Sequence, residues 1–173
     1  MKIDYIQEIK MLKLSRFLIG FFLLLIVFAS VPAMAQQKPI QVSLFTPIQI
    51  FPESDAITGL RLNFIYGRNT TVVGVDWGLV NHTTSGLSKG WQAGVVSIVD
   101  SDFIGFQHSG LNLVKGNFEG LQLGIVNHAN YASGVQFGLV NYARSMKGLQ
   151  IGLVNIIGQG GQFPVFPIVN WSF

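Results

Sequence analysis

The sequence predicts an all-β protein written as one short repeat. A unit G-x-Q-x-G-[LIV]-V-N recurs about eight times, with starts at residues 59, 74, 90, 105, 120, 134, 148 and 163, so the period is 14 to 16 residues. Inside a unit, apolar residues alternate with Gly and Gln, which is the two-residue period of a strand, and no segment shows a competing helical period. Turn-forming residues separate the units, as at Asn69-Thr70-Thr71.

Three copies of the unit are clear, at residues 120–127, 134–141 and 148–155. In the first copy, Leu121 and Leu123 share one face of the expected strand and Gln122 lies on the other. We expect the Gly, Gln and Asn positions of these copies, and of the variant at 74–81, to be structural. They are Gly74, Gly78, Asn81, Gly120, Gln122, Gly124, Asn127, Gly134, Gln136, Gly138, Asn141, Gly148, Gln150, Gly152 and Asn155.

Residues 1–35 have the pattern of a secretory signal peptide. Basic residues precede an apolar run over 17–31, which is too short for a comfortable membrane helix, and Ala33-Met34-Ala35 matches an A-x-A cleavage site. We therefore expect export and cleavage after Ala35, with an uncleaved anchor as the alternative. Met11 opens a more compact leader, so a translation start at Met1 or at Met11 stays open.

Charge is scarce throughout the chain. Asp, Glu, Lys and Arg make up 11% of its 173 residues, against about 25% in a soluble domain. Removing residues 1–35 takes away four basic and two acidic residues, so the formal charge falls from +3 to +1. This composition excludes a disordered solvated chain and a nucleic-acid partner. The absence of cysteine excludes disulfides and thiolate zinc sites.

The first architecture that fits is an antiparallel meander closed into an outer-membrane β-barrel of about eight strands. A membrane-spanning strand needs about 9–11 residues, and a 14–16 residue unit leaves room for a turn. The apolar stripe would face membrane lipid, and Gly and Gln would pack inward. The last strand alternates and ends in an aromatic residue, as does the signal read by the outer-membrane assembly machinery. The residues of that expected signal are Val169, Trp171 and Phe173.

The alternative architecture is a β-solenoid with one repeat per coil, in which equivalent Gln and Asn residues stack into ladders. One detail favours it. Ile125 and Val126 are neighbours and both apolar, so the alternation changes parity at the end of the unit. A straight half-buried strand does not do this, whereas a corner or a bulge does.

The expected organisation is a signal peptide over 1–35, a lead segment or cap over 36–58, and an eight-unit repeat domain over 59–173. Pro47 and Pro52 argue against a central strand in the lead segment.

The polar residues suggest no reaction, so we expect neither enzymatic activity nor a cofactor or metal. His82 and His128 occupy the same unit position three units apart, and His108 lies elsewhere, so convergent metal ligands are not indicated. Asp100 and Asp102 suggest a solvated turn more than a cation site. Asp76 stands at the repeat's Gln position. No small-molecule ligand can be named.

The run GLQLGIVN, GVQFGLVN, GLQIGLVN, with the ending FPVFPIVNWSF, resembles a family of bacterial surface-repeat proteins built from GLQ-x-GLVN units. The resemblance covers about residues 42–173 and implies an exported cell-envelope protein in the outer membrane. We therefore expect a non-enzymatic outer-membrane or cell-surface protein with a structural or envelope role. The alternative is a surface-exposed β-solenoid that acts as an adhesion or interaction module.

Overall fold

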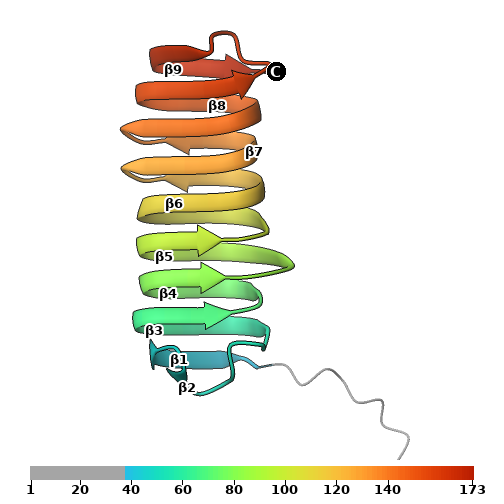
Figure 1. The fold of residues 1–173 in the computed structure, drawn as a ribbon, viewed down its shortest axis with the longest axis vertical. Coiled ribbons are helices and arrows are strands. Elements are labelled where there is room, and N and C mark those ends of the chain that lie inside the picture. Colours follow the sequence, from blue (N-terminus) through green and yellow to red (C-terminus); the bar gives the residue numbers. More distant parts are fainter. Residues whose placement is uncertain (1–37) are drawn as a thin grey trace, which may run out of the picture. The chain divides into compact units, whose positions relative to one another are not determined.

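A computed structural model describes residues 38–173, which fold as one elongated stack of coils (Figure 1). The expected signal peptide lies outside the described residues. The strands are β1 (Ile40–Phe45), β2 (Ile48–Gln49), β3 (Ile57–Asn69), β4 (Val72–Thr83), β5 (Leu87–Val99), β6 (Asp102–Leu123), β7 (Val126–Phe137), β8 (Val140–Gln159) and β9 (Val165–Ser172). They form one sheet in the order β2-β1-β3-β4-β5-β6-β7-β8-β9.

The predicted barrel is wrong, and the alternative, a β-solenoid, agrees with the structure. Strands β3 to β8 pair in parallel, where a barrel meander would pair them antiparallel. The strand order runs from an edge at β2 to an edge at β9, so the sheet does not close. Equivalent residues stack directly, as in the register of Gly120 with Gly134 and of Gly134 with Gly148. Each 14–16 residue unit is therefore one complete coil.

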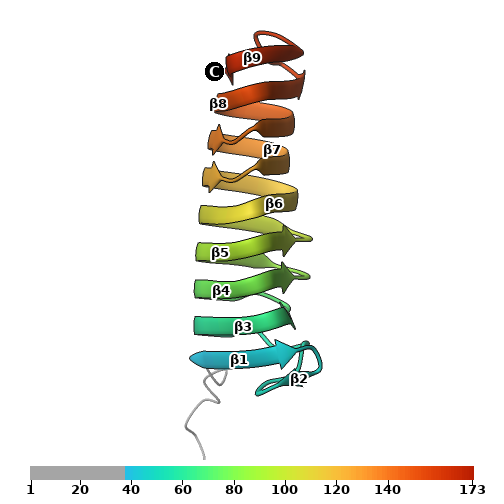
Figure 2. The ribbon, with the colours of Figure 1, turned by 90° about the vertical axis from the view of Figure 1, so that its left-hand side faces the viewer.

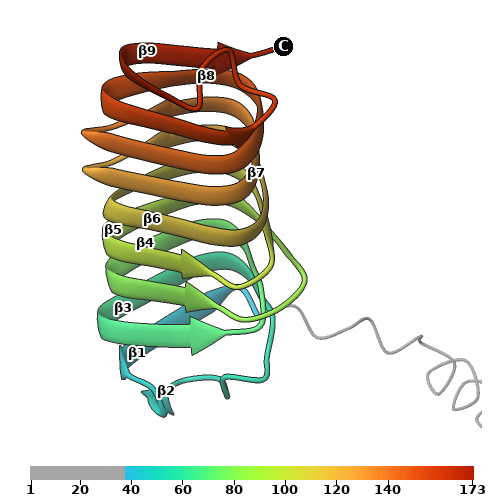
Figure 3. The ribbon, with the colours of Figure 1, turned by 45° about the horizontal axis from the view of Figure 1, so that its top comes forward.

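Each coil is flattened and bends at two edges (Figure 3). The first bend follows the second Gly of the unit, where the alternation changes parity, and we call it the glycine corner. Its members are residues 78–79, 94–95, 109–110, 124–125, 138–139 and 152–153. The second bend lies between units, and we call it the turn corner. Its members are residues 69–71, 84–86, 100–101, 115–116, 130, 144 and 158.

Between the corners, each coil has a long side that carries the Gln and a short side that carries the Asn. In the coil of the first clear copy, the long side is 117–123 and the short side is 126–129. The side-by-side stacking of the coils is visible from two directions (Figure 1 and Figure 2).

The interior has an apolar half and a polar half. The apolar half lies beneath the turn corner, and its members are Val99, Phe103, Val114, Phe118, Ala129, Ala132, Ala143, Met146 and Ile157. The polar half lies beneath the glycine corner, where the Gln and Asn residues of the repeat are fully buried. The outer surface is reversed, with apolar residues around the glycine corner and charges around the turn corner.

Different elements cover the two ends of the stack. Segment 36–58, expected as a lead segment or cap, contributes β1, which pairs in parallel with β3, and β2, which folds back antiparallel on β1. At the other end, β9 runs antiparallel on β8. At each end of the stack, an antiparallel strand, β2 or β9, therefore ends the series of parallel coils.

Candidate functional site

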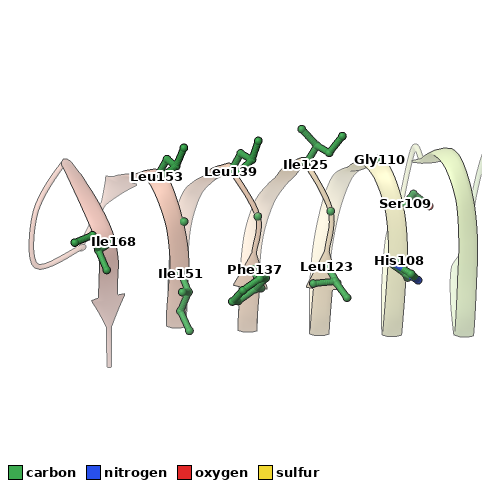
Figure 4. Close-up of a pocket in the computed structure, with 13 residues that line it drawn as sticks. His108, Ser109, Gly110, Leu123, Ile125, Phe137, Leu139, Ile151, Leu153 and Ile168 are labelled. Atoms are coloured by element: carbon green, nitrogen blue, oxygen red, sulfur yellow. The ribbon is translucent and has the colours of Figure 1, made fainter.

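An open apolar groove follows the glycine corner along the stack (Figure 4). Its floor is glycine, and a row of apolar side chains stands on each side of the floor. One wall contains Leu123, Phe137 and Ile151, and the other contains Ile125, Leu139 and Leu153. This section has a volume of about 610 Å³.

A second groove section, also about 610 Å³, continues toward β3 and includes Trp77 and Leu79. His108, Ser109 and Gly110 belong to both sections, so the groove runs along most of the stack. At the C-terminal end, Ile168 lines the groove with a φ of 69°. A β-branched residue pays a steric penalty in that region, and here the conformation leaves the side chain 72% exposed at the end of the groove.

The glycine floor follows from the packing of each coil against its predecessor. A Cβ on Gly138 would lie 2.4 Å from the carbonyl oxygen of Gly124 and 2.7 Å from Nδ2 of Asn127. The repeat's Asn therefore excludes a side chain from the next corner. Two residues other than Gly stand at this position. Asn63 is in register with Gly78, and Ser109 follows the coil where Ser97 replaces Asn. The two hydroxyl oxygens, Oγ of Ser97 and Oγ of Ser109, are 2.6 Å apart.

The buried Asn column satisfies the backbone of the glycine corner from inside. Nδ2 of Asn127 donates to Oδ1 of Asn141 at 2.8 Å and to the carbonyl oxygen of Phe137 at 2.9 Å. Asn112 and Asn141 donate in the same way to the next coil. The carbonyl before the corner is thus paired without water, and the outer side of the corner presents apolar atoms.

A second buried column consists of the Gln residues. From Gln150 back to Gln92, each Nε2 donates to Oε1 of the preceding Gln at 2.7–2.8 Å. The column ends where Gln92 donates to Oδ2 of Asp76 at 2.8 Å. Asp76 is also bound by Arg61, whose Nε and Nη2 donate to its two oxygens at 2.7 Å each. This buried ion pair replaces two Gln residues of the column.

The charged side chains gather at the turn corner and at the N-terminal end. Those at or near the turn corner are Arg68, Lys89, Asp100, Asp102, Lys115, Glu119, Arg144 and Lys147. Lys38, Glu53 and Asp55 lie at the N-terminal end, where Lys38 pairs with Asp55. Asp, Glu, Lys and Arg are all absent from the glycine corner and from the positions directly beside it.

A chain of polar groups lies on the short side near the turn corner. Oη of Tyr66 is 2.8 Å from Nδ1 of His82, and Nε2 of His82 is 2.8 Å from Oδ2 of Asp100. Nζ of Lys115 lies 2.8 Å from Oδ1 of Asp100. Burial raises the pKa of Tyr66, so its hydroxyl stays protonated. Burial opposes ionisation of Asp100, but hydrogen bonds from Lys115 and His82 outweigh it and lower the pKa of this carboxyl.

The remaining polar residues that the sequence singled out are separated. Within residues 38–173, no three His, Asp or Glu side chains come together as a metal site. His128 stacks on Tyr142, with ring centroids 4.9 Å apart. Oδ1 of Asp102 accepts from the backbone nitrogen of Asn117 at 2.7 Å, so this carboxylate organises its own turn.

The predicted assembly signal forms the C-terminal cap. Val169 and Trp171 lie in β9 and pair with Ile151 and Leu149 of β8, and Phe173 follows β9 with 90% of its surface exposed. The assembly role presupposed the last strand of a barrel, and β9 is instead the antiparallel end of a coil stack.

Sequence reasoning placed the repeat's Gly, Gln and Asn residues and missed Arg61 and the groove. Arg61 and Asp76 depart from Gln in adjacent coils with opposite charges, which is the signal that would have found the pair. The groove requires stacked coils and could not follow from a barrel.

Comparison with known proteins found no matching family, curated protein or solved structure. Over residues 38–173, no helix has the length and apolar character needed to cross a membrane.

Proposed function

We propose that the protein is an exported, non-enzymatic interaction module that docks through its glycine corner. The observation that carries this proposal is the division of the outer surface into a charged edge and an uncharged apolar edge. Large contiguous exposed apolar patches mark protein–protein or membrane interaction sites. Export is supported by the leader expected over residues 1–35, and placement in the cell envelope by the resemblance to surface-repeat proteins.

The stacked coils support this role because they hold the apolar side chains in fixed rows. Parallel in-register pairing places Ile125, Leu139 and Leu153 one above another, about 4.8 Å apart. The buried Gln and Asn columns hydrogen-bond each coil to the next, which fixes the register of the coils. A partner therefore meets a preorganised surface and orders few side chains on binding.

The polar chain of Tyr66, His82 and Asp100 gives little support to an enzymatic role. Both ring nitrogens of His82 are engaged, and the Tyr66 hydroxyl remains protonated. A nucleophile in such a chain needs a lowered pKa or a free base. The chain instead joins three successive coils on the short side.

The test compares two triple variants of the full chain expressed in a host that exports it. The corner variant is Leu79→Glu, Ile125→Glu, Leu153→Glu, at side chains that are 51%, 59% and 68% exposed. These coils are not neighbours, so the new charges do not stack. The control variant is Ser85→Glu, Asn130→Glu, Gln159→Glu, which adds the same charge at exposed positions in the turn corner or directly beside it.

We expect the wild-type protein and the control variant to stay with the envelope fraction of the producing cells. The corner variant should be released to the medium, with an unchanged far-UV circular dichroism spectrum. Equal envelope retention of all three proteins would refute docking through the glycine corner.

A further inference from the structure

We infer that the glycine corner docks on the boundary between headgroups and acyl chains of a lipid bilayer, with the stack lying along the membrane surface. The inference rests on the proposed docking function and adds the chemical class of the partner. The six glycine corners, spaced by about 4.8 Å, form an apolar edge of roughly 24 Å. The long axis of the stack, and with it this apolar edge, would lie parallel to the membrane surface.

The first argument is the direction of the exposed apolar side chains. Trp77 and Phe137 point outward from the long side, Leu153 stands on the corner, and Val154 begins the short side. The exposed apolar side chains therefore occupy the long side, the corner and the start of the short side, and Figure 4 shows Phe137 and Leu153 on either side of the bend. A rigid protein partner covers one of these faces, whereas a fluid hydrocarbon layer contacts all of them together. The wrapped arrangement therefore favours lipid.

The second argument is that backbone groups at the glycine corner are hydrogen-bonded within the stack. The nitrogens of Ile125 and Leu139 donate to the carbonyls of Gly110 and Ile125 at 3.0 Å, and the nitrogen of Val154 donates to Leu139 at 2.9 Å. At four of the six corners, an Asn side chain also pairs the preceding carbonyl from inside, at Ala93, Leu123, Phe137 and Ile151. Unpaired peptide groups are what prevents irregular backbone from entering hydrocarbon. Here the polar interior removes that obstacle.

The third argument is the distance between the apolar edge and the charges. Lys147 lies six residues before Leu153 along the long side, which corresponds to about 20 Å of extended strand. An interfacial element buries its apolar face about 5–10 Å deep. At that depth the turn corner and its charges stay in water. Trp77 and Trp91, exposed on the long side, lie where indole rings prefer the interface.

The experiment measures flotation of the exported protein with phosphatidylcholine vesicles and with vesicles that also contain phosphatidylglycerol. We expect the wild-type protein and the Ser85/Asn130/Gln159 control variant to float with both. The Leu79/Ile125/Leu153 corner variant should bind at least tenfold more weakly. Tryptophan emission of the bound wild-type protein should shift to the blue and be quenched by brominated acyl chains.

Orientation is tested by polarised infrared spectra on a supported bilayer. Hydrogen bonds between coils run along the stack, so we expect the amide I dipole to lie in the membrane plane. A dipole along the membrane normal would overturn the lengthwise orientation. If the wild-type protein does not float, or if the corner variant floats equally well, the lipid partner is excluded.

The outcomes separate this inference from the proposed function. Corner-dependent dimerisation without flotation, measured by light scattering, would assign the glycine corner to a second copy of this chain. Envelope retention would then still depend on the corner. The proposed docking function would survive, and only the lipid partner would be withdrawn.

Discussion

Arg61 and Asp76 form a two-point ion pair inside the stack, with both nitrogen–oxygen distances at 2.7 Å and almost no exposed surface. The two residues stand in the column that Gln occupies in the next five coils. Arg61 also donates to the carbonyl oxygen of His82 at 3.0 Å. The pair therefore closes the amide column at its N-terminal end.

The substitution Asp76→Asn should destabilise the protein by about 3–5 kcal/mol, because it leaves the Arg61 guanidinium buried without a counter-charge. The double substitution Arg61→Gln, Asp76→Gln restores the column chemistry and should stay within about 1 kcal/mol of the wild type, since buried ion pairs often match uncharged replacements. Urea midpoints followed by circular dichroism and by tryptophan fluorescence check both values. A double variant as unstable as Asp76→Asn would contradict this account.

Ser97 and Ser109 should behave as a coupled pair. An Asn side chain at 97 would meet the Cβ of Ser109, since a Cβ at the equivalent Gly124 lies 2.7 Å from Nδ2 of Asn112. We expect Ser97→Asn alone to cost about 1–3 kcal/mol through overpacking.

Adding Ser109→Gly to Ser97→Asn should reverse this loss. The new Asn could then donate to Oδ1 of Asn112, a buried atom without a partner in the described chain. We expect the double variant to exceed the wild type by about 1 kcal/mol. A double-mutant cycle of thermal midpoints measures the coupling, and simple additivity would show that the two sites are independent.

Two Gly→Ala substitutions should differ sharply. Gly134 has a φ of 131°, and a Cβ there would lie 2.1 Å from the carbonyl oxygen of Gly120, so Gly134→Ala should prevent the stack from forming. Gly160 has a φ of 75° but its nearest neighbour would be 4.0 Å away, so Gly160→Ala should cost only about 1–2 kcal/mol. Far-UV circular dichroism and thermal melting curves of the two variants measure this difference. Similar stability of the two variants would mean that stacking tolerates a side chain at Gly134.

His128 should make stability depend on pH. Burial lowers its pKa, and its Nδ1 has no partner within the described residues. Between its folded pKa and the unfolded value near 6.5, the unfolded chain binds more protons, so stability falls as pH drops below about 6.5 and levels off below the folded pKa.

The substitution His128→Phe keeps the stacking on Tyr142 and should flatten this dependence. Urea midpoints at pH 7.5 and pH 5 test it. That range stays above the titration of Asp100, whose lowered pKa contributes stability that is lost only at more acidic pH. An unchanged slope in the variant would assign the effect to another group.

Much of each coil could be predicted from the sequence. The two-residue alternation indicated strands with Gln122 inward and Leu121 outward, and the structure has both. The parity change at Ile125 and Val126 indicated a corner, which is where the coil bends. These features depend on local geometry, so one unit is enough to reveal them.

The path of the chain between units could not be read in the same way. Alternation has the same period in parallel and antiparallel sheets, and a unit of 14–16 residues fits either a spanning strand with its turn or a complete coil. Whether successive strands run parallel or antiparallel depends on whether the parity change is a bulge within a strand or a corner where the coil bends. The terminal Phe173 and the strand count favoured the barrel, yet neither reports on that bend.

The amide columns make the coils over residues 120–155 interchangeable. Gln136 and Asn141 meet the same donors and acceptors in the coils before and after them, and the departures from this pattern lie elsewhere, at Arg61, at the Ser97–Ser109 pair and at Asn170. Gain or loss of one 14-residue unit in the middle would therefore change the length of the molecule and leave its cross-section and both caps as they are. Copy number is then a quantity that recombination between repeats can adjust in whole steps, without a new packing problem at each step.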